Sequence, residues 1–395
     1  MKKEFIKKGQ EAEAVSFLSN RTDDDFDAID ASVKEIISKV IKEGDSAVYE
    51  LTEKYGGASK DVIGDLRVSD AEIDEAWNAV GPEVIKTFEL AAENIRRFHE
   101  KQLQKTWSYT EGNDIMLGQL VRPVKNVGIT IPGGSAPLSS TVLMNLIPAK
   151  IAGCPRVIMC SPAGPDGKIN KYVLAAAKIA GADEIYKVGG AQGIAAMAYG
   201  TESIKKVNKI CGPGGAYVAR AKKYVFGTVD IDMIAGPSEV CIIADAAADP
   251  AFLAADMLSQ AEHDVMASSI LITDSAETAE ATAAELEKQL KVLERGEIAR
   301  KSVENNAVIY ITEDLDSAFE IANEIAPEHL ELCVDNPFDY LDSIRHAGSV
   351  FMGKNCPEAL GDYMAGPNHT LPTGGTAKFS SPLSVDDFVK KTQYT

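Results

Sequence analysis

The sequence predicts an α/β protein made of two open α/β domains with mostly parallel sheets, preceded by an N-terminal helical arm. Its 395 residues are enough for two or three domains. From about residue 124 onward, short apolar runs alternate with segments of helical periodicity, which is the pattern of parallel strands covered by helices. Glycine-rich turns follow three of the predicted strands, at the end of the sheet where such folds bind ligands.

The N-terminal part of the chain is predicted to be mainly helical. Residues 1–24 are polar and are expected to form the arm. Apolar residues recur at helical spacing over 29–41 and predict an amphipathic helix. Ser69 and Glu72 have the spacing of a capping box, so another helix is expected to begin there. A further helix is expected to run up to His99, which we interpret as a surface histidine.

Two sets of alternating strands and helices follow, with a predicted hinge between them at Gly236-Pro237. The strands of the first set are predicted at 124–131, 157–160, 185–188 and 207–211. Those of the second set are predicted at 238–243, 269–273, 307–311, 330–334 and 348–352. Each set is expected to form one sheet, and the early helices are expected to complete the domain that contains the second set.

The charge and hydropathy of the chain exclude some classes of partner. The formal net charge is −19, from 40 basic and 59 acidic residues, and no basic patch stands out, so nucleic acid is not an expected partner. No apolar run approaches the length of a membrane span, and the N-terminus lacks the apolar core of a signal peptide. We therefore expect a cytoplasmic protein without a membrane partner.

Six scattered cysteines form no Cys-x-x-Cys pair, and most lie in apolar, strand-like runs. This distribution is typical of small buried hydrophobic residues in a reducing compartment. A catalytic cysteine stays open as an alternative, but no motif supports it.

Three glycine-rich turns are candidates for binding a nucleotide. They are Pro132-Gly133-Gly134, Gly189-Gly190-Ala191-Gln192 and Gly212-Pro213-Gly214-Gly215. Glycine lets backbone amides approach a phosphate, and the N-terminus of the following helix attracts its charge. Each turn alone is weak evidence, because strand-to-helix turns also use glycine for geometry. Three such turns in one domain favour a nucleotide.

A metal site is expected near residues 257–264. Gln260 and His263 are three apart on a predicted helix, so their side chains lie on neighbouring points of one face. Taken alone, such a pair is more often a helix cap or a surface pair. Asp362, in a glycine-rich loop, is a candidate oxygen ligand. Because the chain has only five histidines, a mixed site of Gln260, His263 and Asp362 is favoured over a cage of histidines.

Glu328-His329 joins the two commonest types of general acid and base at a helix-to-strand junction. Such a corner can present both side chains to a cleft. The alternative, a helix end with a surface carboxylate, is the more frequent meaning of a bare Glu-His pair.

Taken together, these stretches resemble the histidinol dehydrogenase family. The resemblance runs in order, with compatible spacing, from about residue 25 to the last residue. The matching stretches are 131–138 (IPGGSAPL), 188–192 (VGGAQ), 212–214 (GPG), 235–239 (AGPSE), 258–263 (LSQAEH), 327–330 (PEHL), 361–363 (GDY), and Asn368-His369 followed by 371–373 (LPT).

The resemblance implies two Rossmann-like domains in a zinc-containing, NAD-dependent homodimer. The implied reaction is oxidation of L-histidinol through L-histidinal to L-histidine. The implied zinc ligands are Gln260, His263 and Asp362, and the implied acid/base pair is Glu328 and His329. Substrate is expected to contact Ser238, Gln260, His263, His329 and Asp362. The cofactor positions are Thr130, Gln192 and Gly215.

Three departures from the family pattern affect these expectations. Thr130 stands where the family usually has tyrosine, and Gly215 stands where it usually has asparagine. Two of the three expected NAD contacts are thus altered, which predicts weaker binding of NAD. The family also continues into a helical tail that carries a last zinc-ligand histidine and a substrate-binding glutamate, and neither follows Thr395 here.

The expected domain boundaries combine both lines of reasoning. They are an arm at 1–24, a discontinuous first domain at 25–131 and 237–382 with the metal and catalytic residues, a second domain at 132–236 on the cofactor side, and the start of a truncated tail at 383–395.

Two alternatives stay open. The altered positions Thr130 and Gly215 favour a related zinc and NAD dehydrogenase of another small polar alcohol. A non-catalytic binding subunit is the third hypothesis, and the retained Glu328-His329 pair argues against it.

Overall fold

The computed structural model describes residues 1–12, 15, 26–133 and 138–395. The chain divides into two compact units. Unit 1 takes in the N-terminal strand, Ala235–Asp362 and Leu371–Pro382, and unit 2 takes in Phe26–Ile234, Tyr363–Thr370 and Leu383–Thr395. Within the described part of the chain, no helix combines the length and hydropathy needed to cross a membrane.

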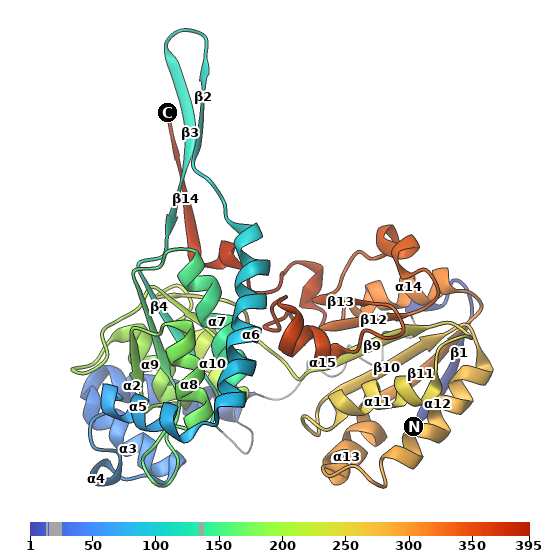
Figure 1. Cartoon of the computed structure of the whole chain (residues 1–395), viewed down its shortest axis with the longest axis horizontal. Helices are drawn as coiled ribbons and strands as arrows, with labels where there is room; N and C mark the ends of the chain where they lie inside the picture. Colours follow the sequence, from blue (N-terminus) through green and yellow to red (C-terminus); the bar gives the residue numbers. More distant parts are fainter. Residues whose placement is uncertain (13–14, 16–25, 134–137) are drawn as a thin grey trace. The chain divides into compact units, whose positions relative to one another are not determined.

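Unit 1 is built on a six-stranded sheet in which neighbouring strands are parallel (Figure 1). The strands, in spatial order, are β1 (Lys2–Ile6), β11 (Ala307–Thr312), β10 (Ser268–Thr273), β9 (Glu239–Ala244), β12 (His329–Cys333) and β13 (Ser349–Met352). The helices are α11 (Pro250–Ala261), α12 (Ala276–Gln289), α13 (Gly296–Asn306), α14 (Leu315–Ile325) and the short α15 (Glu358–Leu360).

Alternate side chains of each strand enter cores on opposite faces of this sheet. In β9, Val240 and Ile242 pack in the core that contains α11, α12 and α13. Cys241 and Ile243 pack on the other face, in the core that contains α14. Burial on both faces explains why these strands appear in the sequence as continuous apolar runs.

Unit 2 contains a five-stranded parallel sheet with helices on both faces. Its strands, in spatial order, are β6 (Glu184–Tyr186), β5 (Arg156–Cys160), β4 (Asn126–Thr130), β7 (Lys209–Cys211) and β8 (Asp230–Ile231). One core joins the sheet to α2 (Asp27–Glu43), α3 (Asp45–Gly56), α4 (Lys60–Ile63), α9 (Gly190–Tyr199) and α10 (Ala216–Val225). The opposite core contains α5 (Asp70–Ala79), α6 (Pro82–His99), α7 (Ser139–Ile151) and α8 (Lys171–Ala180).

A three-stranded antiparallel sheet extends from unit 2 (Figure 1). Its strands are β14 (Val389–Tyr394), β3 (Ile115–Pro123) and β2 (Trp107–Glu111), with β3 in the middle. Gly118 is needed at its place because a Cβ there would lie 2.7 Å from the carbonyl oxygen of Trp107. This sheet was absent from the sequence-based prediction, and every residue of β2 is exposed.

The predicted fold class is confirmed, since both main sheets are parallel and covered by helices. The helix predicted over 29–41 is α2, and the capping box at Ser69 and Glu72 opens α5. His99 was placed wrongly at the surface: its side chain is fully buried, and Nδ1 lies 2.9 Å from the carbonyl oxygen of Ile95. Five of the six cysteines are buried, and Cys356 is partly exposed.

The arm and the domain boundaries differ from the expectation. Lys2–Ile6, expected in a helical arm at 1–24, forms β1 and pairs with β11, whereas 13–14 and 16–25 lie outside the described residues. Residues 25–131 were expected in the first domain, but α2 and α3 share a core with α9 and α10, and β4 pairs with β5 and β7. The early helices therefore belong with 132–234, and the expected tail at 383–395 supplies β14 to the same unit.

Candidate active site

The backbone of one residue, Glu239 at the start of β9, positions both members of the Glu328-His329 pair. Glu328 Oε2 accepts a hydrogen bond from the Glu239 N–H at 2.9 Å. His329 Nδ1 lies 2.9 Å from the carbonyl oxygen of Glu239. Because a carbonyl only accepts, this bond requires the proton on Nδ1. In the neutral ring, Nε2 is then the basic nitrogen, and it faces the rest of the site.

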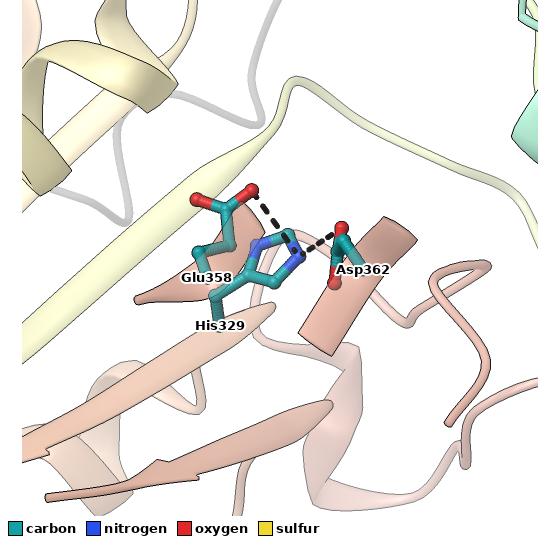
Figure 2. Close-up of side chains that lie close together, drawn as sticks. All are labelled: His329, Glu358 and Asp362. Atoms are coloured by element: carbon teal, nitrogen blue, oxygen red, sulfur yellow. Dashed lines mark hydrogen bonds and ion pairs between the residues drawn. The ribbon is translucent and has the colours of Figure 1, made fainter. Parts of the chain in front are cut away.

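Two carboxyl groups lie beside that nitrogen, as Figure 2 shows. Asp362 Oδ2 is 3.3 Å and Glu358 Oε1 is 3.9 Å from His329 Nε2. One potential ligand atom from each of the three residues lies within 4.8 Å of the others. Asp362 occupies a π-helical turn, Gly361–Ala365, an uncommon geometry that recurs at functional sites.

The cluster retains protons because it is buried. Burial raises the pKa of Glu328 to about 8 and that of Glu358 to about 7. Burial lowers the pKa of His329, but the adjacent carboxyls of Glu328, Glu358 and Asp362 outweigh it, and the net pKa is well above its usual range. Converging carboxyl oxygens and an imidazole in one buried place suit a divalent cation, which would replace these protons.

Gln260 reaches the same cluster from the last turn of α11, where it is buried. When its carboxamide nitrogen faces Glu358, it donates to Oε1 and Oε2 of Glu358 at 3.2 and 2.8 Å, and its oxygen accepts from the Glu239 N–H at 3.1 Å. His263 lies just beyond the end of α11, and its backbone N–H donates to the backbone carbonyl oxygen of Gln260 at 3.2 Å. Ser238 directly precedes β9 and is partly buried.

Sequence reasoning missed Glu358, which contacts both Gln260 and His329. Its own N–H donates to Glu331 Oε1 at 2.9 Å, so a second buried carboxyl fixes the backbone there. A signal was available, since Glu358 and Asp362 are four residues apart, the spacing that puts two side chains on one helical face. A lone acid in a Cys-Pro-Glu context gave no further indication.

The three expected cofactor positions come together in unit 2. Thr130, Gln192 and Gly215 line a cavity of about 410 Å³ at the carboxyl ends of β4 and β7. The N-termini of α9 and α10 border it, so backbone N–H groups and helix dipoles favour an anionic group there. A neighbouring cavity of about 750 Å³ shares part of this lining. The shared residues are Tyr55, Gly56, Pro132, Gly133 and Pro162.

The turn after β4 is only partly described. Gly133 lines both cavities, whereas Gly134 and 135–137 lie outside the described residues. Two of the buried thiols are poor nucleophiles, since burial raises the pKa of Cys160 to about 12 and that of Cys154 to about 11.

Comparison with known proteins identifies a family for this chain. A family model described as histidinol dehydrogenase matches residues 19–395. A histidinol dehydrogenase of Heliobacterium mobile is 50% identical over 380 residues, covering 96% of this chain and 88% of its own length. One of Listeria monocytogenes serovar 1/2a is 52% identical over 366 residues, covering 93% and 85%.

Solved structures give the same result. The crystal structure of histidinol dehydrogenase from Elizabethkingia anophelis has a TM-score of 0.92 and 39% identity, and the match covers 100% of this chain and 90% of that one. An acetylating aldehyde dehydrogenase from Geobacillus thermoglucosidasius has a TM-score of 0.52 at 14% identity, over 98% and 97%, and shares the fold alone. The chain belongs to the histidinol dehydrogenase family.

Proposed function

We propose that this protein is a zinc-containing, NAD-dependent dehydrogenase that oxidises L-histidinol through L-histidinal to L-histidine, the last steps of histidine biosynthesis. The observation that carries the proposal is the basic Nε2 of His329 beside Asp362 and Glu358, with Glu328 fixed next to it. Such a cluster can move protons at a buried site, as an alcohol oxidation requires. Family membership identifies the alcohol.

His329 is the base of the first oxidation. Its Nδ1 proton is bonded to the carbonyl of Glu239, so in the neutral ring, once Nε2 is deprotonated, that nitrogen can take the hydroxyl proton as the alcohol carbon loses hydride. The resulting imidazolium is stabilised by the carboxyls that surround it, which is the same effect that raises the pKa of His329.

Glu328 serves the second oxidation. An aldehyde has no hydroxyl, so water must add to its carbonyl carbon before a second hydride can leave. Glu328, once deprotonated, takes a proton from that water, and loss of hydride from the hydrate yields the acid. Overall one alcohol and one water give one carboxylate, two hydrides and three protons.

Gln260, His263 and Asp362 are the proposed zinc ligands, and Ser238 and His329 complete the proposed contacts with substrate. The donor set fits the metal, because carboxamide oxygen, imidazole and carboxylate all bind zinc. Bound zinc supplies a positive charge that orients the amino alcohol and polarises its oxygen. Glu358 is proposed to orient the Gln260 carboxamide, on the basis of the bonds between them.

NAD is the proposed hydride acceptor, in the cavity lined by Thr130, Gln192 and Gly215. The glycine turns at the N-termini of α9 and α10 suit its pyrophosphate. Thr130 and Gly215 are small, so the cavity is expected to hold NAD with lower affinity than in relatives with tyrosine and asparagine there.

A homodimer is proposed as the working form. The three-stranded sheet exposes large hydrophobic side chains, an arrangement common at protein interfaces. They are Trp107 (51% exposed), Tyr109 (53%), Ile115 (50%) and Met116 (55%). The free, mostly buried thiols support a reducing compartment, and we propose the cytoplasm.

The test is NADH formation from L-histidinol at saturating NAD with added zinc, with an E328Q/H329N double variant as control. The expected result is two NADH per histidinol in the parent chain and none above background in the control. Turnover of other small amino alcohols but not of histidinol would favour the second candidate, for which the altered Thr130 and Gly215 are the observation. Bound zinc and NAD without turnover of any alcohol would overturn the dehydrogenase proposal and favour a binding subunit.

A further inference from the structure

The turn after β7 begins at Gly212, whose backbone conformation only glycine adopts readily. Its φ is +113°, and a Cβ there would lie 2.2 Å from the carbonyl oxygen of Thr130. Thr130 lines the 410 Å³ cavity, and so do the three residues that follow Gly212, which are Pro213, Gly214 and Gly215. The position of the Gly212 peptide therefore decides where this wall of the cavity lies.

Both polar backbone atoms of Gly212 bond to one buried ion pair. The Gly212 N–H donates to Asp232 Oδ2 at 2.7 Å, and the Gly212 carbonyl oxygen accepts from Lys222 Nζ at 2.9 Å. Lys222 Nζ also contacts Asp232 Oδ1 directly. These three interactions close a ring around the first residue of the turn.

The ion pair is fully enclosed and joins separate elements. The Lys222 side chain is 2% exposed and that of Asp232 is 0% exposed. Lys222 belongs to α10, the helix that begins directly after the turn, and Asp232 directly follows β8. A buried ion pair is weak evidence for stability, because removing two charges from water offsets their attraction. Its best-supported use is to specify one conformation, and here that conformation belongs to the turn.

We propose that Lys222 and Asp232 are positioning residues for the dinucleotide, acting through the Gly212 peptide. The inference rests on the proposed use of the cavity for NAD. Gly214 and Gly215 have no side chains, so only their backbone atoms can meet a ligand, and backbone atoms work as a binding surface only where the chain is held still. The ion pair holds that wall without touching the ligand.

The test compares three single variants in the full-length chain. K222M removes the donor to the Gly212 carbonyl. D232N removes the charge of Asp232 but keeps an oxygen that can accept from the Gly212 N–H. It therefore still tests the inference if K222M does not fold. K209M is the matched control: Lys209 is 5% exposed on β7, and its Nζ donates at 2.9 Å to the Asp230 side chain instead of the turn.

The measurements are the Kd of NADH by fluorescence titration, and kcat and KM for NAD. K222M is expected to raise the Kd and the KM for NAD about 10- to 100-fold, with D232N intermediate, and kcat at saturating NAD is expected to change much less. K209M is expected to keep the Kd of NADH and the KM for NAD within about twofold of the parent, even if it lowers the stability of the protein as much as K222M does. The affinity for zinc, whose ligands lie in unit 1, is expected to stay as in the parent.

Two results would overturn the inference in different ways. If the parent binds NADH and K222M and D232N bind it equally tightly, the ion pair does not position the dinucleotide, and the proposed function stands. If K209M weakens binding as much as K222M, the effect is general loss of packing. A parent chain that binds no dinucleotide overturns the proposed use of the cavity, and this inference with it.

Discussion

The backbone N–H and carbonyl of Glu239 each bond to one of two neighbouring side chains, Glu328 and His329. The N–H donates to Glu328 and fixes the position of its carboxyl group, whereas the carbonyl accepts from His329 Nδ1 and fixes the tautomer of its ring. Because both partners are main-chain atoms of a central strand, they cannot rotate away as side-chain partners could. The geometry is therefore built into the sheet.

Conservative variants of the pair should affect different halves of the reaction. H329N should slow oxidation of the alcohol about 10²- to 10⁴-fold, because no basic nitrogen replaces Nε2. E328Q should slow oxidation of the aldehyde by a similar factor and spare the alcohol step, because only the second oxidation needs activated water. Single-turnover NADH formation from histidinol and from histidinal separates the two. Equal losses on both substrates in both variants would argue against this division.

Arg156 and Glu184 form a two-pronged ion pair in unit 2 that should make stability depend on pH. Arg156 Nε and Nη2 lie 2.8 and 2.9 Å from the two carboxyl oxygens, and hydrogen bonding to Arg156 lowers the pKa of Glu184 to about 2. An unfolded glutamate titrates near 4.3, so the contribution is complete above about pH 4.3 and is lost as the pH falls through about 2.

In E184Q, the loss of stability at low pH that is due to the Arg156–Glu184 ion pair should disappear. We expect the parent to lose on the order of 2–3 kcal/mol between about pH 5 and pH 2 through this group, and the variant to lose correspondingly less. Urea denaturation at a series of pH values measures the difference. Parallel profiles for parent and variant would show that the ion pair does not supply the dependence.

Sequence reasoning found the residues whose chemistry is evident from type and spacing. Glu328 and His329 are adjacent in sequence and in space, and Gln260 and Asp362 do reach their cluster. Glu358 was missed, because its four-residue spacing from Asp362 is a weak signal alone and its place in the cluster depends on contacts with Gln260 of α11 and His329 of β12. His99 was missed for the related reason that a histidine beside polar residues can still be covered by a distant segment, here Asn368, 3.3 Å away.

At the scale of elements, β1 illustrates why local patterns fail at sheet edges. Lys2–Ile6 contains two apolar residues, too few to indicate a strand against a polar background. The strand exists because β11 offers a free edge with which it pairs in parallel register. Ile6 enters the core of unit 1, whereas Phe5, on the opposite side, is 56% exposed.

Substitutions within β1 should separate those two faces. Ile6→Ala is expected to destabilise unit 1 by roughly 2–3 kcal/mol, since it leaves a cavity in the core on that face of the sheet. Phe5→Ala, the matched control, should change stability by less than about 0.5 kcal/mol. Denaturant midpoints of the two variants provide the measurement. A larger loss for Phe5→Ala would mean that its exposed face is covered in the working protein.

For the whole molecule, the two halves of the proposed chemistry reside in separate units. The proposed metal ligands and acid/base residues lie in unit 1, and the proposed cofactor cavity lies in unit 2. Each site depends on the fold of its own unit. The two can therefore be disabled independently.

Removal of the metal should test that independence. Treatment with a zinc chelator should lower turnover of histidinol on the order of 10²-fold or more, and added zinc should restore it. The Kd of NADH should change by less than about twofold, since no residue of the cavity is a proposed ligand. Coupled loss of both functions would show that the metal also organises unit 2.

The alternation of strands and helices was enough to predict two parallel sheets, but the assignment of the early helices was wrong. Periodicity reveals that α2 has one apolar face; it does not reveal which sheet receives Val33 and Val40. In the same way, β14 pairs with β3 although the two strands are far apart in the sequence, and nothing in Val389–Tyr394 identifies its partner. Such information resides in packing between distant segments.

The pairing of β14 with β3 also has a consequence for biosynthesis on the ribosome. Translation produces β3 early, but the strand that completes its sheet emerges only after all the strands of unit 1 have been made. Unit 1 can finish its sheet at β13, while the antiparallel sheet of unit 2 still has one side open. Unit 2, whose five-stranded sheet is made before β9 of unit 1, is thus finished last, and the open edge of β3 is a part of the nascent chain that depends on protection by chaperones.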